Sequence, residues 1–548
     1  MILIYDFIYR ANNGVLENLL EDIAKSTKHY LTKDGDKVSL CVQGSEEELK
    51  SFSDILSKTL PFSLFLKDVS VRMVTQWDSL KAIKMPKCEI ALPFTQKALS
   101  KAKAEFNPFV KNEIGINPDI YPPLIFEDKN TRKKYDDGFK EAFLKAAKII
   151  VDGGYLNIKS KNGYVCVSKL QDKKYENFNV MLTDLSATSK IAVLKSAEIS
   201  ALASLEKPLI KTHSNLIFAS NYPNFPRFFD IALANDLFLY LLGVALFEMG
   251  IEFVVLEAKQ SAPDASLYFE NEIKQEERLQ VCTLDNGQNI ILKGTSSTSP
   301  QLLKSIKRVK NPCHMQFALA MHELDLFEDA NCGVYLSLKN DDMIMFYSAQ
   351  TGVLDMVNIT YEDSLQEMLE SIAKEDATGI RLIENYTEKF PLIVEKAKKI
   401  SLKQKAKNIA NLWSIAAFLM GLDGSLEEAR DKLLENISTF GGQKGPRVDY
   451  KLIDENSAKT TINAHKFIKS VMSFRLADVD DGLLSYGIAE SLVYFLSDFM
   501  DGLKSDFQIK NVLLMGSLFG NKTISNLCVK HLGVNHKVHF NKELPIEL

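Results

Sequence analysis

The sequence predicts a mixed α/β protein made of several domains in series, with an α+β fold in its N-terminal part. The length of 548 residues is sufficient for three or four domains. Stretches with strand periodicity alternate with amphipathic helical stretches along the whole chain. The proline-bearing residues 76–135 interrupt this alternation as a connector would. The segment 294–300 (GTSSTSP) is either a second linker or a loop within a domain.

The first 75 residues alternate regularly between strand and helix patterns. Ser45 begins one helix, and Glu48 stands at the position that completes a capping box. The order of elements is βαββαβ, which is typical of a ferredoxin-like split βαβ sandwich. The other predicted elements are a helix at Leu16–Lys28 and strands at Ile2–Tyr9, Tyr30–Lys33, Val38–Gln43 and Leu64–Val74.

The middle of the chain continues as mixed α/β structure up to about residue 295. Its first predicted elements are a helix at Phe139–Val151 and a strand at Tyr155–Lys159. The longest apolar stretch, Leu237–Phe247, covers eleven residues. Since a membrane-spanning helix needs about 20 residues, we expect a buried helix here and no membrane insertion.

Residues 312–548 form a third α/β block. The predicted elements before the terminal segment are a helix at Tyr361–Ile372 and strands at Met315–Met321, Val334–Leu338 and Met343–Ser348. Strands joined by glycine turns and followed by helices fit the arrangement of an actin-like ATPase, although periodicity alone does not establish it.

The segment Val512–Leu532 combines a short strand, a glycine turn and a helix. Val512–Leu514 predicts a buried strand, and Lys522–Leu532 predicts an amphipathic helix. Glycine lets a backbone approach phosphate closely, and a helix start offers free N–H donors, so Gly516, Ser517 and Asn521 are candidate nucleotide-binding residues. Such a step can equally be a simple connection. Sixteen residues follow Leu532, and we expect no second phosphate clamp from them.

Composition excludes several function classes. The net charge is −5 with both signs interspersed, so no nucleic-acid footprint is present. The N-terminal MILIYDFIYR lacks a basic n-region, so we expect no signal peptide. The seven cysteines form no CxxC pair, which argues against a zinc ribbon and a disulfide framework and favours a cytoplasmic protein. His536 and His539 are the closest pair of histidines, and Glu543 is the one acidic residue near them. Because a metal site needs more ligands than this, we expect none there.

The chain contains, in this order, KDGDKVSLCVQGSEEELKSF (33–52), IIVDGGYLNIKSKNGYVCV (149–167), ASLEKPLIK (203–211) and SAQTGVLDMVNITYEDSLQEML (348–369) with the terminal MGSLFGN (515–521). In this order the passages resemble HypF, the carbamoyltransferase of hydrogenase maturation. The resemblance implies an acylphosphatase-like domain, a YrdC-like domain and a TsaD-like domain in series. The acylphosphatase-like domain would cover 1–75, and a connector at 76–137 would replace the family's zinc-finger pair. The YrdC-like domain would cover 138–311, and the TsaD-like domain 312–548.

Several residues depart from the family pattern. In the acylphosphatase-like loop 11–17, Leu16 stands where the family has Arg, and Lys33 stands where it has Asn. Cys88 is the one cysteine in the region of the zinc-finger pair, and a lone thiol cannot form a tetrahedral zinc site. We therefore expect a docking role for the first domain. Gln350 and Val353 stand where the TsaD-like motif has His and Asp.

Other residues retain part of the pattern. Lys159 and Lys207 are basic residues in the YrdC-like part, where the family makes a carbamoyl adenylate from ATP. Asp423, in Gly421–Gly424, resembles the remnant of an Asp-Gly nucleotide turn. Each of the three is a candidate nucleotide-binding residue, and each is also explained as an ordinary surface or turn residue. No catalytic residue and no metal ligand are assigned.

The resemblance and its departures together predict an accessory factor for maturation of a nickel–iron hydrogenase, without the family's full chemistry. The alternative is an active carbamoyltransferase that uses carbamoyl phosphate and ATP to supply the cyanide-ligand precursor. A nucleotide-binding protein unrelated to hydrogenases is the third reading. The implied partners are a hydrogenase subunit or a maturation protein such as HypE, with no nucleic acid. ATP with Mg²⁺ is the one cofactor that these residues leave open.

Overall fold

The computed structural model describes residues 1–548 apart from 77–81, 85–93, 112–119, 273–276, 306–310, 423 and 455–459, so Cys88 and Asp423 lie outside the described residues. The chain forms two compact units. The first contains Met1–Lys304 and Lys542–Pro545, and the second contains Ser305–Asn541 and Ile546–Leu548. The finer domain boundaries of the sequence analysis stay a prediction.

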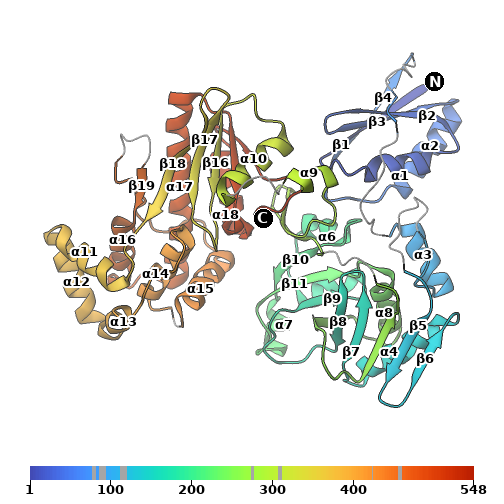
Figure 1. Cartoon of the computed structure of the whole chain (residues 1–548), viewed down its shortest axis with the longest axis horizontal. Coiled ribbons are helices and arrows are strands. Elements are labelled where there is room, and N and C mark those ends of the chain that lie inside the picture. The colour runs from blue at the N-terminus through green and yellow to red at the C-terminus, as the bar shows by residue number, and fades with distance from the viewer. Residues whose placement is uncertain are drawn as a thin grey trace. The chain divides into compact units, whose positions relative to one another are not determined.

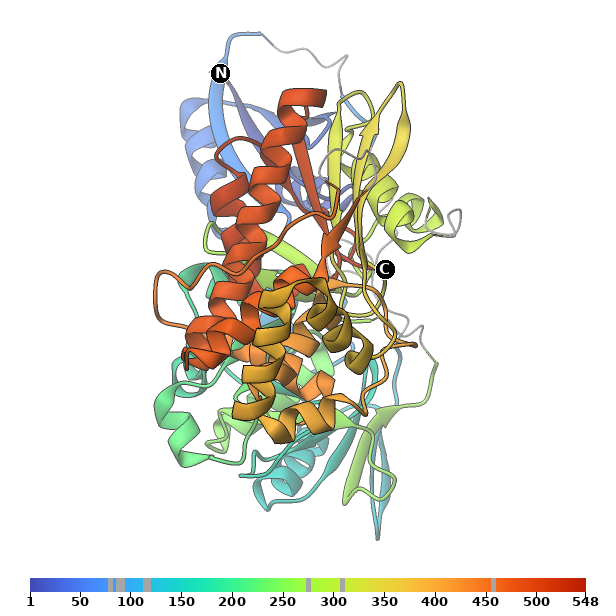
Figure 2. The same cartoon turned by 90° about the vertical axis from the view of Figure 1, so that its left-hand side faces the viewer.

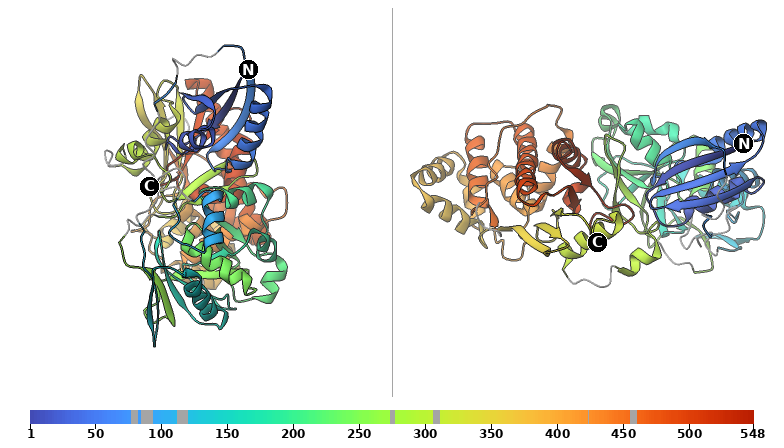
Figure 3. Two further views of the ribbon diagram at one scale, coloured as in Figure 1. Left: turned by 90° about the vertical axis from the view of Figure 1, so that its right-hand side faces the viewer. Right: turned by 90° about the horizontal axis from the view of Figure 1, so that it is seen from above.

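The N-terminal part of the first unit is an antiparallel sheet of four described strands with two helices on one face (Figure 1). The strand order is β2-β3-β1-β4, and the right-hand view of Figure 3 shows these strands in blue. The Tyr5 ring meets the Phe52 ring edge to face at 5.6 Å, and this contact packs α2 on the sheet. The elements are β1 (Ile2–Tyr9), α1 (Val15–Ala24), β2 (Lys28–Asp34), β3 (Lys37–Gln43), α2 (Glu46–Thr59) and β4 (Leu66–Val74).

The predicted βαββαβ order is confirmed. The capping box at Ser45 is also confirmed, since Glu48 N–H donates to Ser45 Oγ and Ser45 N–H donates to the Glu48 carboxylate. Helix α1 ends at Ala24, four residues before the predicted end, because Lys28 already belongs to β2. Strands β2 and β4 begin at Lys28 and Leu66, two residues away from their predicted starts at Tyr30 and Leu64. Local signals thus identified every element of this part but misplaced some boundaries.

A second sheet of the first unit contains eleven described strands, in the order β15-β14-β10-β11-β9-β12-β8-β7-β13-β5-β6. Helices α4 (Phe139–Val151) and α8 (Leu237–Glu248) contribute side chains to its core. The predicted bounds of α4 are confirmed, and so is the buried helix at α8. Strands β5 (Leu124–Asp128) and β6 (Arg132–Tyr135) lie in the expected connector and pair in this sheet, because β5 forms a ladder with β13 (Ala265–Phe269).

The remaining elements of this part of the chain follow from the same alternation. They are α3 (Gln96–Glu105), β7 (Leu156–Ser160), β8 (Gly163–Ser168), β9 (Asn179–Leu182), α5 (Thr188–Ile191), α6 (Ser196–Ala203), β10 (Leu209–His213), α7 (Leu216–Asn221), β11 (Phe228–Leu233), β12 (Phe253–Ala258), β14 (Gln280–Thr283), β15 (Asn289–Lys293) and α9 (Pro300–Ser305).

The second unit is built around a sheet of six described strands in the order β19-β18-β17-β16-β20-β21. Strands β16, β17 and β18 are antiparallel neighbours, whereas β20 runs parallel to both β16 and β21. The strands are β16 (Asn331–Tyr335), β17 (Met343–Ser348), β18 (Gly352–Thr360), β19 (Thr460–Asn463), β20 (Asn511–Met515) and β21 (Lys537–His539).

The strand predicted at Met315–Met321 is wrong, because these residues belong to helix α10 (Pro312–Leu324). The Asn311 side chain caps this helix by accepting hydrogen bonds from the N–H groups of Cys313 and His314, and Pro312 occupies the first turn. A short apolar run does not distinguish a strand from a buried helix. The cap at Asn311 was the signal that decided between them.

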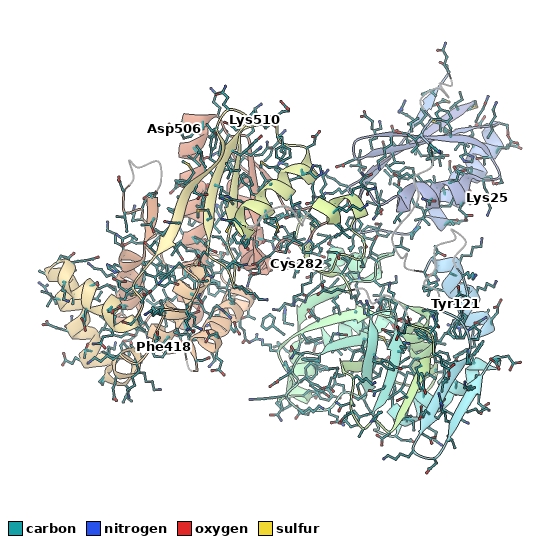
Figure 4. The ribbon with its side chains drawn as sticks, in the orientation of Figure 1. Lys25, Tyr121, Cys282, Phe418, Asp506 and Lys510 are labelled. Atoms are coloured by element: carbon teal, nitrogen blue, oxygen red, sulfur yellow. The ribbon has the colours of Figure 1, made fainter. Side chains whose placement is uncertain are left out.

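Helices fill most of the second unit between its strands. Helix α17 lies along the sheet (Figure 2), with the Phe507 ring 5.0 Å from the Phe346 ring. Asp506 near the end of α17 and Lys510 just before β20 are labelled in Figure 4. No helix within the described ranges is long and apolar enough to cross a membrane. The helices are α11 (Leu365–Glu375), α12 (Ala377–Lys389), α13 (Pro391–Ala397), α14 (Ile409–Met420), α15 (Leu426–Thr439), α16 (Ala464–Leu476), α17 (Asp481–Phe507) and α18 (Lys522–Leu532).

Candidate functional site

The candidate site of the second unit lies at the carboxyl ends of β16 and β20. The two strands are parallel neighbours with Tyr335 in register with Met515, so the turns that follow them meet at one edge of the sheet. Ligands of open α/β sheets bind outside the carboxyl ends of parallel strands. Residues 336–340 follow β16 at this edge, and Gly516 and Ser517 follow β20.

Gly516 is required by a close approach between these two turns. Its φ is 99°, in the region that favours glycine, and a Cβ at this position would overlap the backbone of Leu336. The Leu336 carbonyl accepts a hydrogen bond from Leu518 N–H at 3.1 Å. Gly516, which the sequence predicts as a position where the backbone approaches phosphate, is therefore also required for packing against Leu336.

The carboxylate of Glu547 occupies the edge formed by these turns. One oxygen, Oε2, accepts a hydrogen bond from the Ser517 N–H at 2.7 Å. The other, Oε1, accepts from Ser337 Oγ at 2.6 Å, Asn340 Nδ2 at 2.8 Å and Tyr335 Oη at 3.0 Å. Four uncharged donors thus hold one anion.

The donors are oriented by bonds that do not involve Glu547. Ser337 Oγ accepts the N–H groups of Lys339 and Asn340, both at 2.9 Å, so its one proton is left for the carboxylate. The buried Asp342 carboxyl accepts hydrogen bonds from Ser337 N–H at 2.6 Å and from Ile409 N–H at 2.7 Å. These bonds fix the turn that follows β16. The Ser337 donor and its turn are therefore held in place by contacts other than Glu547.

The electrostatics match this geometry. Burial raises the pKa of Glu547, but hydrogen bonds from Ser337 and Ser517 outweigh burial and hold that pKa below its ordinary value. Burial raises the pKa of Asp342 well above its ordinary value, and the nearby Glu547 charge adds to the effect. Of these two carboxyl groups, Glu547 is the one whose surroundings favour the ionised form.

Asn521 lies at the start of α18 and acts there as its N-cap. Its Oδ1 accepts from the N–H groups of Thr523 and Ile524, and its Nδ2 donates to Ser438 Oγ at 2.9 Å. The predicted strand, turn and helix of this segment are confirmed. The nucleotide-binding roles of Gly516, Ser517 and Asn521 stay a prediction.

The two candidate lysines of the first unit both donate to backbone carbonyls. Lys159 Nζ lies 3.0 Å from Phe269 O and 2.8 Å from Asn271 O, and 4.4 Å from the centre of the Phe269 ring. Lys207 Nζ donates to Ala203 O at 2.6 Å. Burial lowers the pKa of both lysines. Their phosphate-binding roles stay a prediction, as does that of Asp423.

The loop after β1 holds a second carboxylate. Glu543 accepts hydrogen bonds from Asn12 N–H at 2.6 Å and Ser299 N–H at 2.8 Å. Lys33 Nζ donates to Asn12 Oδ1 at 2.8 Å and Glu17 Oε1 at 2.7 Å. This loop is thus bound by the chain's own groups within the first unit.

A metal centre was not expected. Among the residues that the structure describes, no group of three or more His, Cys, Asp and Glu side chains is arranged to hold a metal ion. His536 Nε2 lies 2.9 Å from an Asp501 carboxylate oxygen, and His539 Nε2 lies 3.0 Å from Asn511 Oδ1.

Sequence reasoning missed the residues that complete the edge of the second unit. Glu547, in the sixteen residues after Leu532, was not identified as a contact of this turn, although its carboxylate accepts a hydrogen bond from Ser517 N–H. Asn340 follows the predicted strand Val334–Leu338, but Ser337 lies inside that prediction, because β16 ends three residues earlier at Tyr335. The carboxyl end of a strand is where α/β ligands bind, and this was the available signal. The pairing of Glu547 with Ser337 spans 210 residues and has no local signature.

The comparisons with known proteins agree with this architecture. No family model matches the chain. The chain is 26% identical over 564 aligned positions to Protein HydE of Wolinella succinogenes, covering 99% of both chains. It superposes on full-length HypF in the phosphate- and nucleotide-bound form with a TM-score of 0.64 and 12% identity, covering 100% of this chain and 96% of that one.

The HypF of T. kodakarensis gives a TM-score of 0.63 at 13% identity, with coverage of 100% and 96%. The likeness to both solved structures shows the fold, and the likeness to HydE extends over nearly the whole sequence. The chain therefore has the fold of HypF and is similar in sequence to HydE along nearly its whole length.

Proposed function

We propose that the chain is an accessory factor in the maturation of a nickel–iron hydrogenase, descended from a HypF-type carbamoyltransferase and lacking its full chemistry. The similarity to HydE and the HypF fold both extend over the whole chain, which supports a role in the same process. The fold by itself does not determine activity, so the argument about chemistry depends on the site.

The observation that carries the proposal is the Glu547 carboxylate on the Ser517 N–H at the carboxyl ends of β16 and β20. A phosphate approaching Ser517 would meet this negative charge at close range, and like charges at such distances repel strongly in a partly buried site. In the first unit, Glu543 similarly occupies the Asn12 N–H of the acylphosphatase-like loop. Two carboxylates thus stand where phosphate chemistry would need free donors.

The proposed partners follow from the process. A hydrogenase subunit or a HypE-like maturation protein would dock on the retained scaffold, and the proposed location is the cytoplasm. ATP with Mg²⁺ remains the proposed ligand if any nucleotide binds.

Complementation of a deletion strain tests the proposal. Lys159→Met and Lys207→Met remove the two candidate phosphate lysines, and a scaffold protein keeps hydrogenase activity in both variants at matched protein levels. Loss of activity in both, with wild-type protein levels, would overturn the proposal. Gly516→Val is unsuitable as a test of nucleotide binding, because its side chain would overlap Leu336 and disturb packing.

A second candidate function is an active carbamoyltransferase, and the converging donors at Tyr335, Ser337, Asn340 and Ser517 favour it. Such a set can hold an oxyanion if Glu547 moves. This function predicts ATP turnover that depends on carbamoyl phosphate in the purified protein. Absence of turnover in the presence of a HypE-like partner would exclude it.

A further inference from the structure

We propose that Tyr335, Ser337, Asn340 and the Ser517 N–H form an oxyanion-binding site, and that Glu547 is its displaceable internal ligand. A phosphate or a free carboxylate takes the place of the Glu547 carboxylate when that side chain is removed or moves away. This inference does not depend on the hydrogenase role, since it concerns the chemistry of the pocket alone.

The first step of the argument is the number and kind of donors. Glu547 Oε1 accepts three hydrogen bonds and Oε2 accepts one, with donor–acceptor distances from 2.6 to 3.0 Å. Hydrogen bonds to an ionised acceptor are among the strongest in proteins. Phosphate and carboxylate oxygens are both suited to such a set, because each accepts several bonds and donates none.

The second step is that the donors keep their orientation without Glu547. Ser337 Oγ is held by two backbone N–H groups, and Asn340 Nδ2 also donates to Tyr335 Oη at 3.1 Å. The Ser517 Oγ accepts Leu338 N–H at 2.9 Å, which fixes the second turn. Each turn is thus anchored by its own contacts.

The third step is burial. Tyr335 is 1% exposed and Ser337 is 0% exposed, so their hydroxyl groups cannot turn to bulk solvent. A buried donor left without an acceptor costs about 1–3 kcal/mol. Removal of the Glu547 carboxylate therefore leaves a site whose lowest free energy is reached by binding another anion.

The fourth step is access. Glu547 is partly exposed, and the neighbouring Leu548 is 38% exposed. Ile546 is buried, and its carbonyl accepts a hydrogen bond from Gly516 N–H at 2.8 Å. A rotation of the Glu547 side chain can thus open the pocket while Ile546 keeps the backbone in place.

Anion rescue of Glu547→Ala tests the proposal. Thermal unfolding is followed in potassium phosphate, in potassium acetate and in potassium chloride of the same ionic strength. We expect the melting temperature of the variant to fall below that of the wild type, and about 10 mM phosphate or acetate to restore about 2–4 °C in a saturable manner. The wild type should respond equally to all three salts.

The acetate and phosphate arms distinguish the two sources of the oxyanion. A response to acetate alone identifies a carboxylate site, and a response to phosphate identifies a phosphoryl site; either supports an oxyanion site. Glu384→Ala, which removes an exposed carboxylate from α12, is the matched control and should show no anion-specific response. Ser337→Ala combined with Glu547→Ala should lose the rescue.

Glu547→Gln keeps the shape of the side chain and protects the test against a folding defect in Glu547→Ala. Its amide NH₂ would face donors, so we expect a lower melting temperature and a similar anion response. The proposal is overturned if both variants respond to phosphate and acetate no more than to chloride. It is also overturned if Glu384→Ala shows the same rescue.

Discussion

His465 donates through Nε2 to a carboxylate oxygen of Glu362 at 2.7 Å, in the helical part of the second unit. Its other ring nitrogen, Nδ1, lies 2.5 Å from Glu375. Both nitrogens face carboxylates, so both carry protons and the ring is an imidazolium. Lys469 lies 3.1 Å from Asp376 and 3.4 Å from Glu375, so this cluster ties α16 to α11 and the start of α12 by charge.

The first prediction is that this cluster loses part of its stabilising effect both at alkaline pH, through His465, and at acid pH, through Glu362. The hydrogen bond to Glu362 raises the pKa of His465, so its stabilisation is present below the unfolded value of about 6.5 and is lost as pH rises through the folded pKa. Burial opposes the shift of Glu362, but the bond from His465 lowers its pKa to about 2. The Glu362 contribution is therefore present above about pH 4.5 and is lost on acidification towards pH 2.

Urea unfolding of His465→Gln measures this effect. We expect the free energy of unfolding to fall by about 1–3 kcal/mol at about pH 5.5 and by clearly less at about pH 9. His322→Gln, at an exposed position of α10, is the control and should change stability little at either pH. An equal loss for His465→Gln at both pH values would contradict the assignment.

The second prediction concerns the turn after β20. Gly516→Ala places a Cβ against the Leu336 backbone at a positive φ, so we expect a loss of about 3 kcal/mol or more in stability. Gly502→Ala is the matched control, since nothing lies within 4 Å of a Cβ at this exposed position of α17. We expect it to be neutral or to stabilise by about 0.5–1 kcal/mol. Thermal and urea unfolding compare the two, and similar effects would show that the close approach is not maintained.

The third prediction separates a structural lysine from a phosphate ligand. Lys159→Met removes two partly buried hydrogen bonds to backbone carbonyls and should lower stability by about 1–3 kcal/mol. We expect the melting-temperature response to ATP and Mg²⁺ to match that of the wild type. Lys148→Met, at an exposed position of α4, controls for loss of charge. A wild-type ATP response that disappears specifically in Lys159→Met would establish phosphate binding instead.

The fourth prediction concerns a buried pair in the helical part of the second unit. Trp413 Nε1 donates to Tyr450 Oη at 2.7 Å, and Trp413 is fully buried. Tyr450→Phe leaves the indole N–H without this acceptor, and we expect a loss of about 1–3 kcal/mol with a shift of tryptophan emission. Tyr121→Phe, at a residue that is 53% exposed, should change neither quantity. Unchanged stability of Tyr450→Phe would show that another acceptor replaces the phenol.

The elements with strong local signals were predicted well. The capping box at Ser45, the helix at Phe139–Val151 and the strand–turn–helix from Val512 to Leu532 all depend on residues within a few positions of one another. The strand prediction at Met315–Met321 is wrong because a short apolar run fits a strand and a buried helix equally. The helix cap at Asn311 was not part of that prediction. Prediction was thus reliable where capping or periodicity left one solution.

The candidate site was predicted in part. Gly516 and Ser517 were identified from the turn, but Ser337, Asn340 and Glu547 were not. Lys159 is a candidate because the resemblance to HypF implies a basic residue near phosphates there. Its ammonium position depends on the carbonyls of Phe269 and Asn271, more than a hundred positions further along the chain. Sequence position does not reveal which carbonyl a lysine will reach.

The sequence by itself determined most of the strands and helices and the glycine turn after β20, because these depend on local hydrogen bonding and on periodic burial. The tertiary structure decided what occupies that turn. Parallel pairing of β16 with β20 brings the buried donors of Ser337 and Ser517 to one edge, where they require an acceptor. Glu547 supplies it, and this choice depends on packing between segments that lie far apart in the chain.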